Sequence, residues 1–106
     1  MTVIFHRLFQ KDLTAALRYY DEEGGSKLGD RFVEEVDAVV DRITGNPKRF
    51  HFVAEGIRRA PLRSFPYHIL FEESGDRVKI LILRHDKRHP RFGMTRRSTS
   101  WSDPGR

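Results

Sequence analysis

The stretch "YHILFEESGDRVKILILRH", residues 67–85, predicts two β-strands joined by a tight turn. Read as a strand, its first residues place Tyr67, Ile69 and Phe71 on one face and His68, Leu70 and Glu72 on the other. The "SGD" that follows supplies the small and polar residues that favour a turn. The remaining "RVKILILRH" holds a continuous apolar run from Ile80 to Leu83, and such a run indicates a strand buried on both faces. We therefore predict a β-hairpin whose second strand is central in a sheet.

The part of the chain before this hairpin predicts one strand and two helices. "TVIFH" (2–6) is β-branched and aromatic, which favours an opening strand. Two apolar stripes at helical spacing follow, and the glycines of "EEGG" (22–25) separate them. Ser26 can cap the second helix, and "GNP" (45–47) ends it. A short connection between two helices predicts an antiparallel two-helix hairpin. The stripes consist of Phe9, Leu13, Ala16, Leu17 and Tyr20, and of Leu28, Phe32, Val36, Val39, Val40 and Ile43.

These elements together predict an α+β fold. "IRRAPL" (57–62) adds a short strand before the hairpin, so the sheet has three to four antiparallel strands. The two helices pack on one of its faces, and polar strand residues collect on the other. At 106 residues the chain forms one domain, which we expect to span residues 1–92. Residues 93–106 lack periodicity and predict a polar C-terminal tail.

The charge of the chain is unevenly distributed. Residues 1–40 hold five Lys/Arg against eight Asp/Glu, a balance of −3, whereas residues 41–106 hold fifteen against seven, a balance of +8. The basic part attracts polyanions such as nucleic acid, or an acidic protein, although it also fits a merely solubilising surface. With no cysteine, disulfides, thiolate metal sites and thiol catalysis are excluded. No apolar run approaches the roughly 20 residues of a membrane span, and we expect a cytoplasmic protein.

The stretch "RHDKRHP", residues 84–90, places five side chains able to carry positive charge within seven positions. Three interpretations fit it: a metal site, a site that cleaves or holds RNA, and a solvated surface. The HxxxH spacing of His85 and His89 binds zinc when both lie on one face of a helix. Here the segment leaves a strand and ends at Pro90, no third ligand is apparent, and the intervening lysine and arginine would repel a cation. We therefore predict no metal site.

The second interpretation is metal-independent RNA cleavage. It requires a general base, cations that stabilise the phosphorane-like transition state, and a general acid. Arginine and lysine supply the cations, and histidine suits the other two roles near neutral pH. The candidate catalytic residues are Arg59, Arg63, His68 and Arg88, and the candidate nucleic-acid or target-binding residues are Arg58, Arg84, His85, Lys87 and His89. Cationic side chains at a sheet edge are also typical of a solvated surface, so both interpretations stay open. No phosphate-loop spacing occurs, and we expect no cofactor.

The stretch "LRSFPYHILFEESGDRVKILILRHDKRHP" resembles the C-terminal half of the RelE/ParE superfamily, the bacterial toxins of type II toxin–antitoxin modules. The likeness lies in "PYHILFE", the turn, the apolar strand and the "RHxxRxP" ending. Further upstream, "GDRFVEEVDAVVDRITGNPKRF" resembles the second helix of the superfamily and its exit turn, so the likeness covers residues 2–92. It implies a small α+β toxin that an antitoxin neutralises by wrapping a segment around it. Operator DNA would be contacted only through the antitoxin.

The resemblance implies two modes of action. RelE-like members cut mRNA in the ribosomal A site with basic residues and usually a C-terminal tyrosine, whereas ParE-like members poison DNA gyrase without that catalytic set. The positions that match the RelE-like set are Arg59, Arg63, His68 and either Lys87 or Arg88. The tyrosine is missing, since the nearest aromatic residue is Phe92. The "RHxxRxP" ending is closer to ParE-like and plasmid-stabilisation sequences, which favours gyrase inhibition.

Two alternatives to gyrase inhibition remain: a ribosome-dependent mRNA endoribonuclease, and a degenerate module that binds an antitoxin and has no toxicity. Whether the protein is an enzyme therefore stays open at this point. The opposite charges of the two parts of the chain also predict where the antitoxin binds. We expect acidic segments of the antitoxin to cover the basic sheet.

Overall fold

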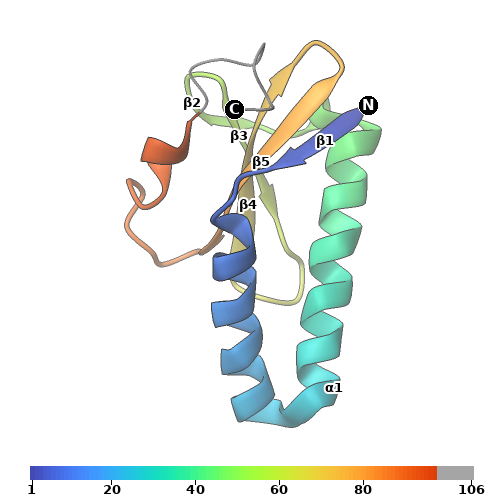
Figure 1. Cartoon of the computed structure of the whole chain (residues 1–106), viewed down its shortest axis with the longest axis vertical. Helices are drawn as coiled ribbons and strands as arrows, with labels where there is room; N and C mark the ends of the chain where they lie inside the picture. The colour runs from blue at the N-terminus through green and yellow to red at the C-terminus, as the bar shows by residue number, and fades with distance from the viewer. Residues whose placement is uncertain (98–106) are drawn as a thin grey trace.

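The computed structural model describes residues 1–97, which form a single α+β unit (Figure 1). Five strands, one long helix and two short 3-10 helices follow one another along the chain. In order, the elements are β1 (Thr2–Phe5), α1 (Phe9–Gly45), η1 (Pro47–Arg49), β2 (Phe52–Ala54), β3 (Ile57–Pro61), β4 (Tyr67–Ser74), β5 (Arg77–His85) and η2 (Met94–Arg96). The predicted hairpin at 67–85 is therefore present as β4 and β5, and the predicted opening strand as β1.

The sheet differs from the prediction in the number and direction of its strands. It has five strands in the order β1-β5-β4-β3-β2, and β1 runs parallel to β5 while the other neighbours are antiparallel. The expected three to four antiparallel strands are thus corrected to a five-strand mixed sheet. β1 can run parallel to β5 because α1 and the strands β2 to β4 separate the two in the chain, and a parallel pair needs such a long connection. β2 has three residues, too few to show alternation in the sequence.

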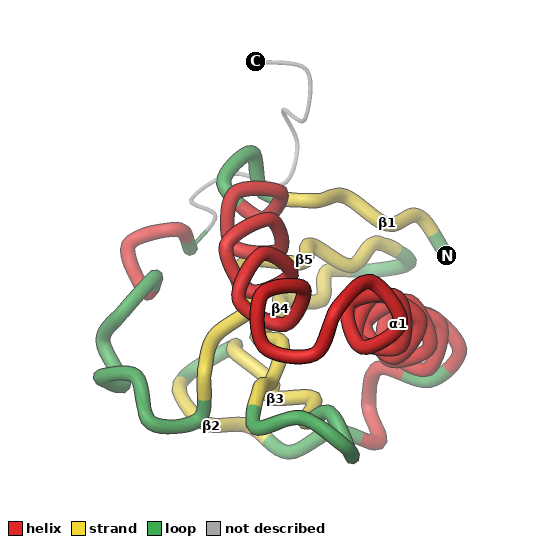
Figure 2. Tube along the Cα trace, turned by 90° about the horizontal axis from the view of Figure 1, so that it is seen from below, coloured by secondary structure: helices red, strands yellow, loops and turns green. Residues whose placement is uncertain are grey.

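The expected two-helix hairpin is also corrected. The structure has one helical element, α1, in which Gly25 alone adopts a non-helical conformation with φ 81° and ψ −178°. The chain reverses at this kink, so the two arms of α1 run side by side over the sheet (Figures 1 and 2). No loop separates the arms, because glycine adopts this backbone conformation without the clash that a Cβ would cause. The break predicted at 22–25 is thus found at Gly25, but it lies within one helical element and not between two. The expected cap at Ser26 stays a prediction.

The two arms of α1 pack on one face of the sheet around a continuous apolar core. Phe32 is fully buried, and its ring lies 5.0 Å from those of Tyr20 and Phe65 and 5.3 Å from that of Tyr67, centroid to centroid. The core joins both predicted helical stripes to the inward side chains of the strands. Its buried members are Phe9, Ala16, Phe32, Val36, Val39, Ile43, Ala60, Leu62, Phe65, Ile69, Phe71, Val78, Ile80 and Leu83.

A β-bulge shifts the register between β4 and β5. Phe71 lies opposite Ile80, whereas Leu70 lies opposite Ile82, so Leu81 is an extra residue in β5. Beyond the bulge the shifted register places Arg84 opposite His68. The apolar run of β5 does not alternate with polar residues because both faces of the strand are buried, and the bulge places Leu81 and Ile82 in the same cluster. The bulge also brings two of the predicted site residues together.

The second face of the sheet is covered by the chain itself. Phe92 and Met94 pack against Ile82 and its neighbours Ile57, Leu70 and Leu81, which form a second buried cluster. A side chain at Gly93 would collide with Ile82, so the backbone lies directly on the sheet there. We call residues 86–97 the C-terminal segment. The predicted boundary after residue 92 stays a prediction, and residues 98–106 of the predicted tail lie outside the described residues.

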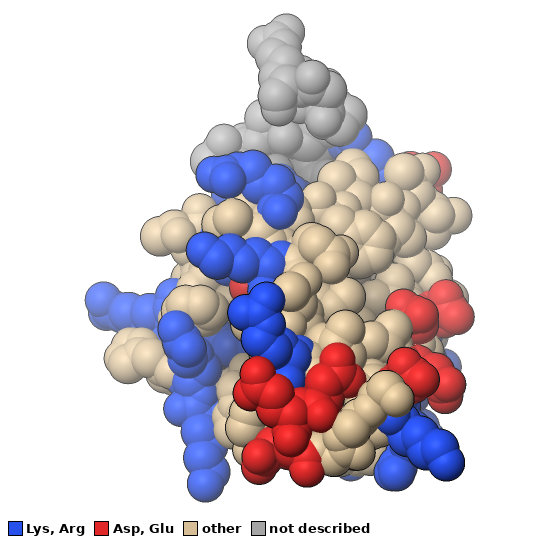
Figure 3. Space-filling view, turned by 60° about the horizontal axis from the view of Figure 1, so that its bottom comes forward, with Lys and Arg blue, Asp and Glu red and all other residues tan. Residues whose placement is uncertain are grey.

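On one face of the molecule the two signs of charge are partly separated. In Figure 3, most of the Lys and Arg side chains lie along the left flank, while Asp and Glu side chains gather at the lower centre and on the right, beside a smaller Lys and Arg group. Within residues 1–97, no helix is both long and apolar enough to cross a membrane.

Candidate functional site

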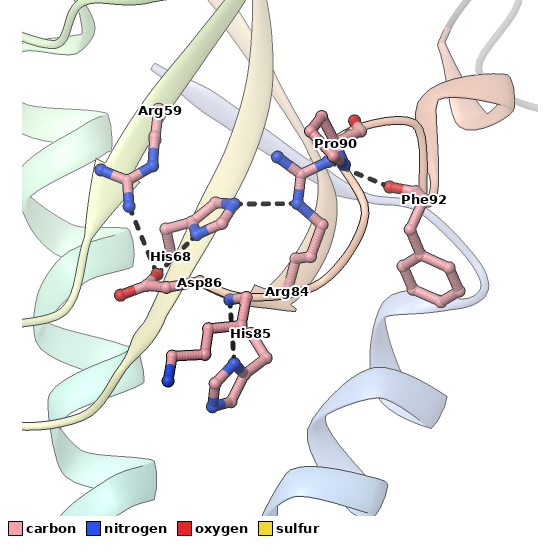
Figure 4. Close-up of polar contacts among 8 residues, drawn as sticks. Arg59, His68, Arg84, His85, Asp86, Pro90 and Phe92 are labelled. Atoms are coloured by element: carbon pink, nitrogen blue, oxygen red, sulfur yellow. Dashed lines mark hydrogen bonds and ion pairs between the residues drawn. The ribbon is translucent and has the colours of Figure 1, made fainter.

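Four polar side chains from three strands meet on the sheet face opposite α1 (Figure 4). His68 of β4 lies between Arg84 of β5 and Asp86 of the turn after β5. Arg84 Nε is 3.0 Å from His68 Nε2, and His68 Nδ1 is 2.8 Å from Asp86 Oδ1. The same oxygen is 3.3 Å from a terminal nitrogen of Arg59 on β3. We call Arg59, Asp86, His68 and Arg84 the histidine network.

The network fixes the protonation of His68. An arginine Nε only donates, so Nε2 of His68 accepts and carries no proton. The proton of the neutral ring is therefore on Nδ1, which donates to the Asp86 carboxylate. His68 is only 2% exposed, and burial lowers its pKa below the ordinary value of 6.5, with the Arg59 and Arg84 charges adding to the effect and Asp86 opposing it. His68 is thus a neutral histidine with both nitrogens engaged.

Arg84 links this network to the C-terminal segment. Its Nη1 donates to the carbonyl oxygen of Pro90 at 2.6 Å and to that of Phe92 at 3.2 Å (Figure 4). Arg84 is 8% exposed, although it was predicted to contact nucleic acid or a target. Its hydrogen bonds hold the segment against the sheet, and in this arrangement they leave little of the guanidinium for an external phosphate.

The exposed cations of the "RHDKRHP" stretch lie beyond the network. The Arg88 guanidinium carbon stacks 3.8 Å from the centroid of the Phe92 ring. The His85 ring meets Tyr67 edge-on at 5.0 Å, and its Nδ1 accepts the backbone N–H of Lys87. His89 Nδ1 similarly accepts the N–H of Arg91. In residues 1–97 no three His, Asp or Glu side chains are grouped as metal ligands.

The other two predicted arginines lie away from the network. Arg58 donates to the carbonyl oxygen of Phe50 at 2.7 Å, and its guanidinium carbon lies 3.8 Å from the centroid of the Phe52 ring. Both contacts hold β2 against β3. Arg63 is exposed in the loop between β3 and β4, where its backbone N–H donates to the Glu35 carboxylate. Of the four candidate catalytic residues, only Arg59 and His68 share a hydrogen-bonded network.

A buried ion pair, Asp12 with Arg96, was missed by the sequence analysis. Arg96 binds both carboxylate oxygens of Asp12, at 2.5 and 3.1 Å, and the two side chains are about one-tenth exposed. Asp12 also accepts the N–H of Leu83, and Arg96 donates to the carbonyl oxygen of Leu81. The pair thus provides hydrogen-bond partners for backbone groups of β5 at Leu81 and Leu83, which follow the residues that pair with β1. The sequence offered one indication of this pair. Asp12 follows Phe9 by three residues and so lies beside it on the apolar face of the helix, where a carboxylate needs a partner.

A groove opens where β1 meets both arms of α1. Its volume is about 730 Å³, and its floor is mostly apolar, with Phe5 about half exposed at one end. Two carboxylates lie on the second arm of α1 and one arginine follows β1. The lining residues include Phe5, Arg7, Phe9, Leu13, Val36, Asp37, Val40 and Asp41.

Two side chains of the sheet that could transfer a proton, those of His68 and Tyr67, are constrained by their surroundings. A general base needs a lone pair free to take a substrate proton, and both nitrogens of His68 have protein partners. Burial raises the pKa of Tyr67, so its phenol keeps its proton more firmly than an exposed tyrosine. The fold and this surface together define a small α+β protein with a basic sheet edge and an apolar groove.

Comparisons with known proteins identify the family. Residues 3–90 match the model of the ParE toxin of type II toxin–antitoxin system, parDE, and the chain belongs to that family. The predicted resemblance to the RelE/ParE superfamily is thereby confirmed. Toxin ParE2 of Mycobacterium tuberculosis, in two strains, is 28% identical over 85 residues, which cover 80% of this chain and 81% of the relative. A solved structure titled "Chromosomal ParDE TA system from P. aeruginosa" shares the fold, with a TM-score of 0.72, 19% identity, and coverage of 80% of this chain and 95% of that one. Membership of the family implies an antitoxin partner.

Proposed function

We propose that the protein arrests bacterial growth by binding DNA gyrase without catalysing a reaction of its own. One observation carries this choice: His68, the best-placed candidate for a general base, is buried and neutral, and both of its nitrogens are hydrogen-bonded. A ribosome-dependent endoribonuclease needs a group that takes the 2′-hydroxyl proton. The lack of a tyrosine at Phe92 points in the same direction, because a phenyl ring cannot transfer a proton.

The exposed cations after β5 are the proposed contacts to the target. His85, Lys87, Arg88 and His89 surround a turn that the histidine network holds in place. Held charges bind a partner better than mobile ones, because less side-chain and backbone entropy is lost on association. The proposal places the protein in the bacterial cytoplasm, where its target acts.

Induced expression in a bacterial host tests the mode of action. We expect growth arrest with filamentation and DNA damage, while cellular mRNA stays intact. His68→Gln, which cannot serve as a titrating base, is expected to retain toxicity within about tenfold if the variant remains folded. Arrest with mRNA cut at codons, abolished by His68→Gln in a folded protein, would instead identify a ribonuclease. A soluble product that causes no arrest would support the degenerate module.

We further propose that the antitoxin binds the groove between β1 and α1 rather than the sheet face. The sheet face opposite α1 already carries the C-terminal segment of the protein itself, so an antitoxin lying there would have to displace Phe92 and Met94. The groove offers an open apolar floor with Asp37 and Asp41 along one wall. An amphipathic antitoxin segment with apolar side chains inward and basic side chains toward these carboxylates would be complementary. This revises the expected placement on the basic sheet.

Phe5→Ala tests the groove, and Phe52→Ala is its matched control. The two phenylalanines are 49% and 58% exposed, and they lie on the two opposite edge strands of the sheet. We expect Phe5→Ala to weaken antitoxin binding by roughly 10- to 100-fold, the loss of a buried aromatic anchor, and Phe52→Ala to leave it unchanged. Titration calorimetry with the product of the adjacent antitoxin gene measures both. Equal affinities for the two variants would place the antitoxin elsewhere.

A further inference from the structure

We propose that the histidine network is a pH-sensitive fastening: protonation of His68 at Nε2 releases the Pro90–Phe92 end of the turn at 86–92 from Arg84. This inference goes beyond the proposed function, because it concerns how the chain holds its own turn and not what that turn binds. The turn contains Lys87, Arg88 and His89, so its release would alter how these side chains are presented.

The hydrogen bond between Arg84 and His68 exists only while Nε2 carries a lone pair. Protonation would turn this nitrogen into a donor that faces the Nε–H of Arg84 at 3.0 Å, two donors with no acceptor between them. It would also place a positive ring beside a guanidinium in a site that is 2% exposed on the histidine side. The contact then changes from attractive to repulsive, and Arg84 must move away.

The movement of Arg84 reaches the turn directly. The Nη1 group of Arg84 holds the carbonyl oxygens of Pro90 and Phe92, and Asp86 on the other side of His68 begins the turn. The Pro90–Phe92 end of the turn is therefore held through the imidazole, whereas Asp86 is also held by its backbone N–H, which donates to the carbonyl oxygen of Pro66 at 2.8 Å. The Asp12–Arg96 pair secures the chain separately a few residues later, which confines the release to the turn and leaves η2 in place.

Burial favours the neutral form of His68, while the charges around the ring act in both directions. Arg59 of β3 and Arg84 of β5 oppose a charged ring, and the Asp86 carboxylate of the turn supports one. From the rest of the turn, the groups that face the network are backbone carbonyls bound to Arg84, while Arg88 stacks on Phe92. Burial is the largest contribution and lowers the pKa of His68 below that of an exposed histidine.

The sign of the pH dependence follows from linkage. With the turn released, His68 is solvated and titrates near its ordinary value of about 6.5. With the turn fastened its pKa is lower. The released form therefore binds more protons, and between the two pKa values its population rises about tenfold for each pH unit of acidification. Above pH 6.5 the fastened form of the turn therefore has its full stability, and below that pH its stability relative to the released form decreases.

Amide hydrogen exchange and imidazole nitrogen shifts measured by NMR on the full chain test the inference. The reporters are the amides of Arg88 and Phe92, which donate to the carbonyl oxygens of His85 and His89. We expect their protection factors to fall about tenfold per pH unit below 6.5, while those of β4 and β5 stay constant. The nitrogen shifts are expected to report the Nδ1–H tautomer of His68.

Two variants complete the test. His68→Gln keeps an acceptor for Arg84 without a titrating group, and its reporter amides are expected to show no pH dependence of protection. His89→Gln, in the same turn but outside the network, is expected to behave as the original protein does. Three results would overturn the inference: an Nε2–H tautomer, a His68 that titrates at or above 6.5, or protection that stays constant with pH in the unaltered chain. The tautomer and titration readouts come from the unaltered chain, so they remain decisive if His68→Gln fails to fold.

Discussion

Replacing Phe32 by alanine is expected to lower the free energy of unfolding by about 3–5 kcal/mol, the usual cost of truncating a buried phenylalanine. Phe32 lies in the second arm of α1 and has no exposed surface. Its ring contacts Tyr20 of the first arm and Phe65 and Tyr67 of the sheet side, so it joins all three parts of the core. The cavity left behind would be bordered by rigid rings that cannot easily close it. Urea unfolding followed by circular dichroism measures the change.

Phe52→Ala provides the comparison for this prediction. Phe52 is 58% exposed on the edge strand β2, and its main contact is with the guanidinium of Arg58. Its loss should cost no more than about 1 kcal/mol. Similar destabilisation by Phe32→Ala and Phe52→Ala would mean that the arms of α1 do not close on the sheet around Phe32.

Removing either partner of the Asp12–Arg96 pair is expected to cost about 3–5 kcal/mol. Both Asp12→Ala and Arg96→Ala leave a largely buried charge without its partner. Each also removes a side-chain hydrogen bond from the edge of β5, at Leu83 or at Leu81. Because each single change already loses the shared interaction, the double variant should be destabilised by clearly less than the sum of the two. Urea unfolding of the three variants gives this double-mutant cycle.

The exposed pair between Lys48 and Glu73 is the control for the cycle. Its nitrogen–oxygen distance is 3.1 Å, comparable to the buried pair, but the lysine side chain is 74% exposed. Solvent screening limits such a pair to about 0–1 kcal/mol, so Lys48→Ala should change stability little. Effects of Asp12→Ala and Arg96→Ala as small as that of Lys48→Ala would show that the C-terminal segment is not secured at η2.

The spacing of apolar residues correctly predicted those helices and strands in which it repeats regularly. The strand boundaries expected at 67–73 and 77–85 agree closely with β4 and β5, and the buried residues of α1 other than Gly29 come from the predicted stripes. The parallel placement of β1 and the existence of β2 depend on contacts across the whole chain, which no local window contains. The helical break was misjudged for a different reason. Two glycines favour a loop, yet Gly25 alone turns the chain and Gly24 stays within α1.

The candidate site was only partly predictable because its geometry depends on a bulge. A regular hairpin with the observed turn would place His68 opposite a neighbour of Arg84, and the extra residue Leu81 changes that pairing. The sequence therefore marked His68 and Arg84 as candidates but did not predict that they bind each other. It also gave Asp86 no role in the candidate site, although this carboxylate accepts the hydrogen bond from Nδ1 of His68.

A supercoiling assay with purified DNA gyrase tests the central claim most directly. The protein is added to gyrase and relaxed plasmid, and in parallel to ribosomes carrying mRNA. We expect inhibited supercoiling or accumulated gyrase-cleaved DNA, relieved by prior addition of the antitoxin, with the mRNA uncut. Unimpaired supercoiling together with mRNA cut at the ribosomal A site would contradict the account.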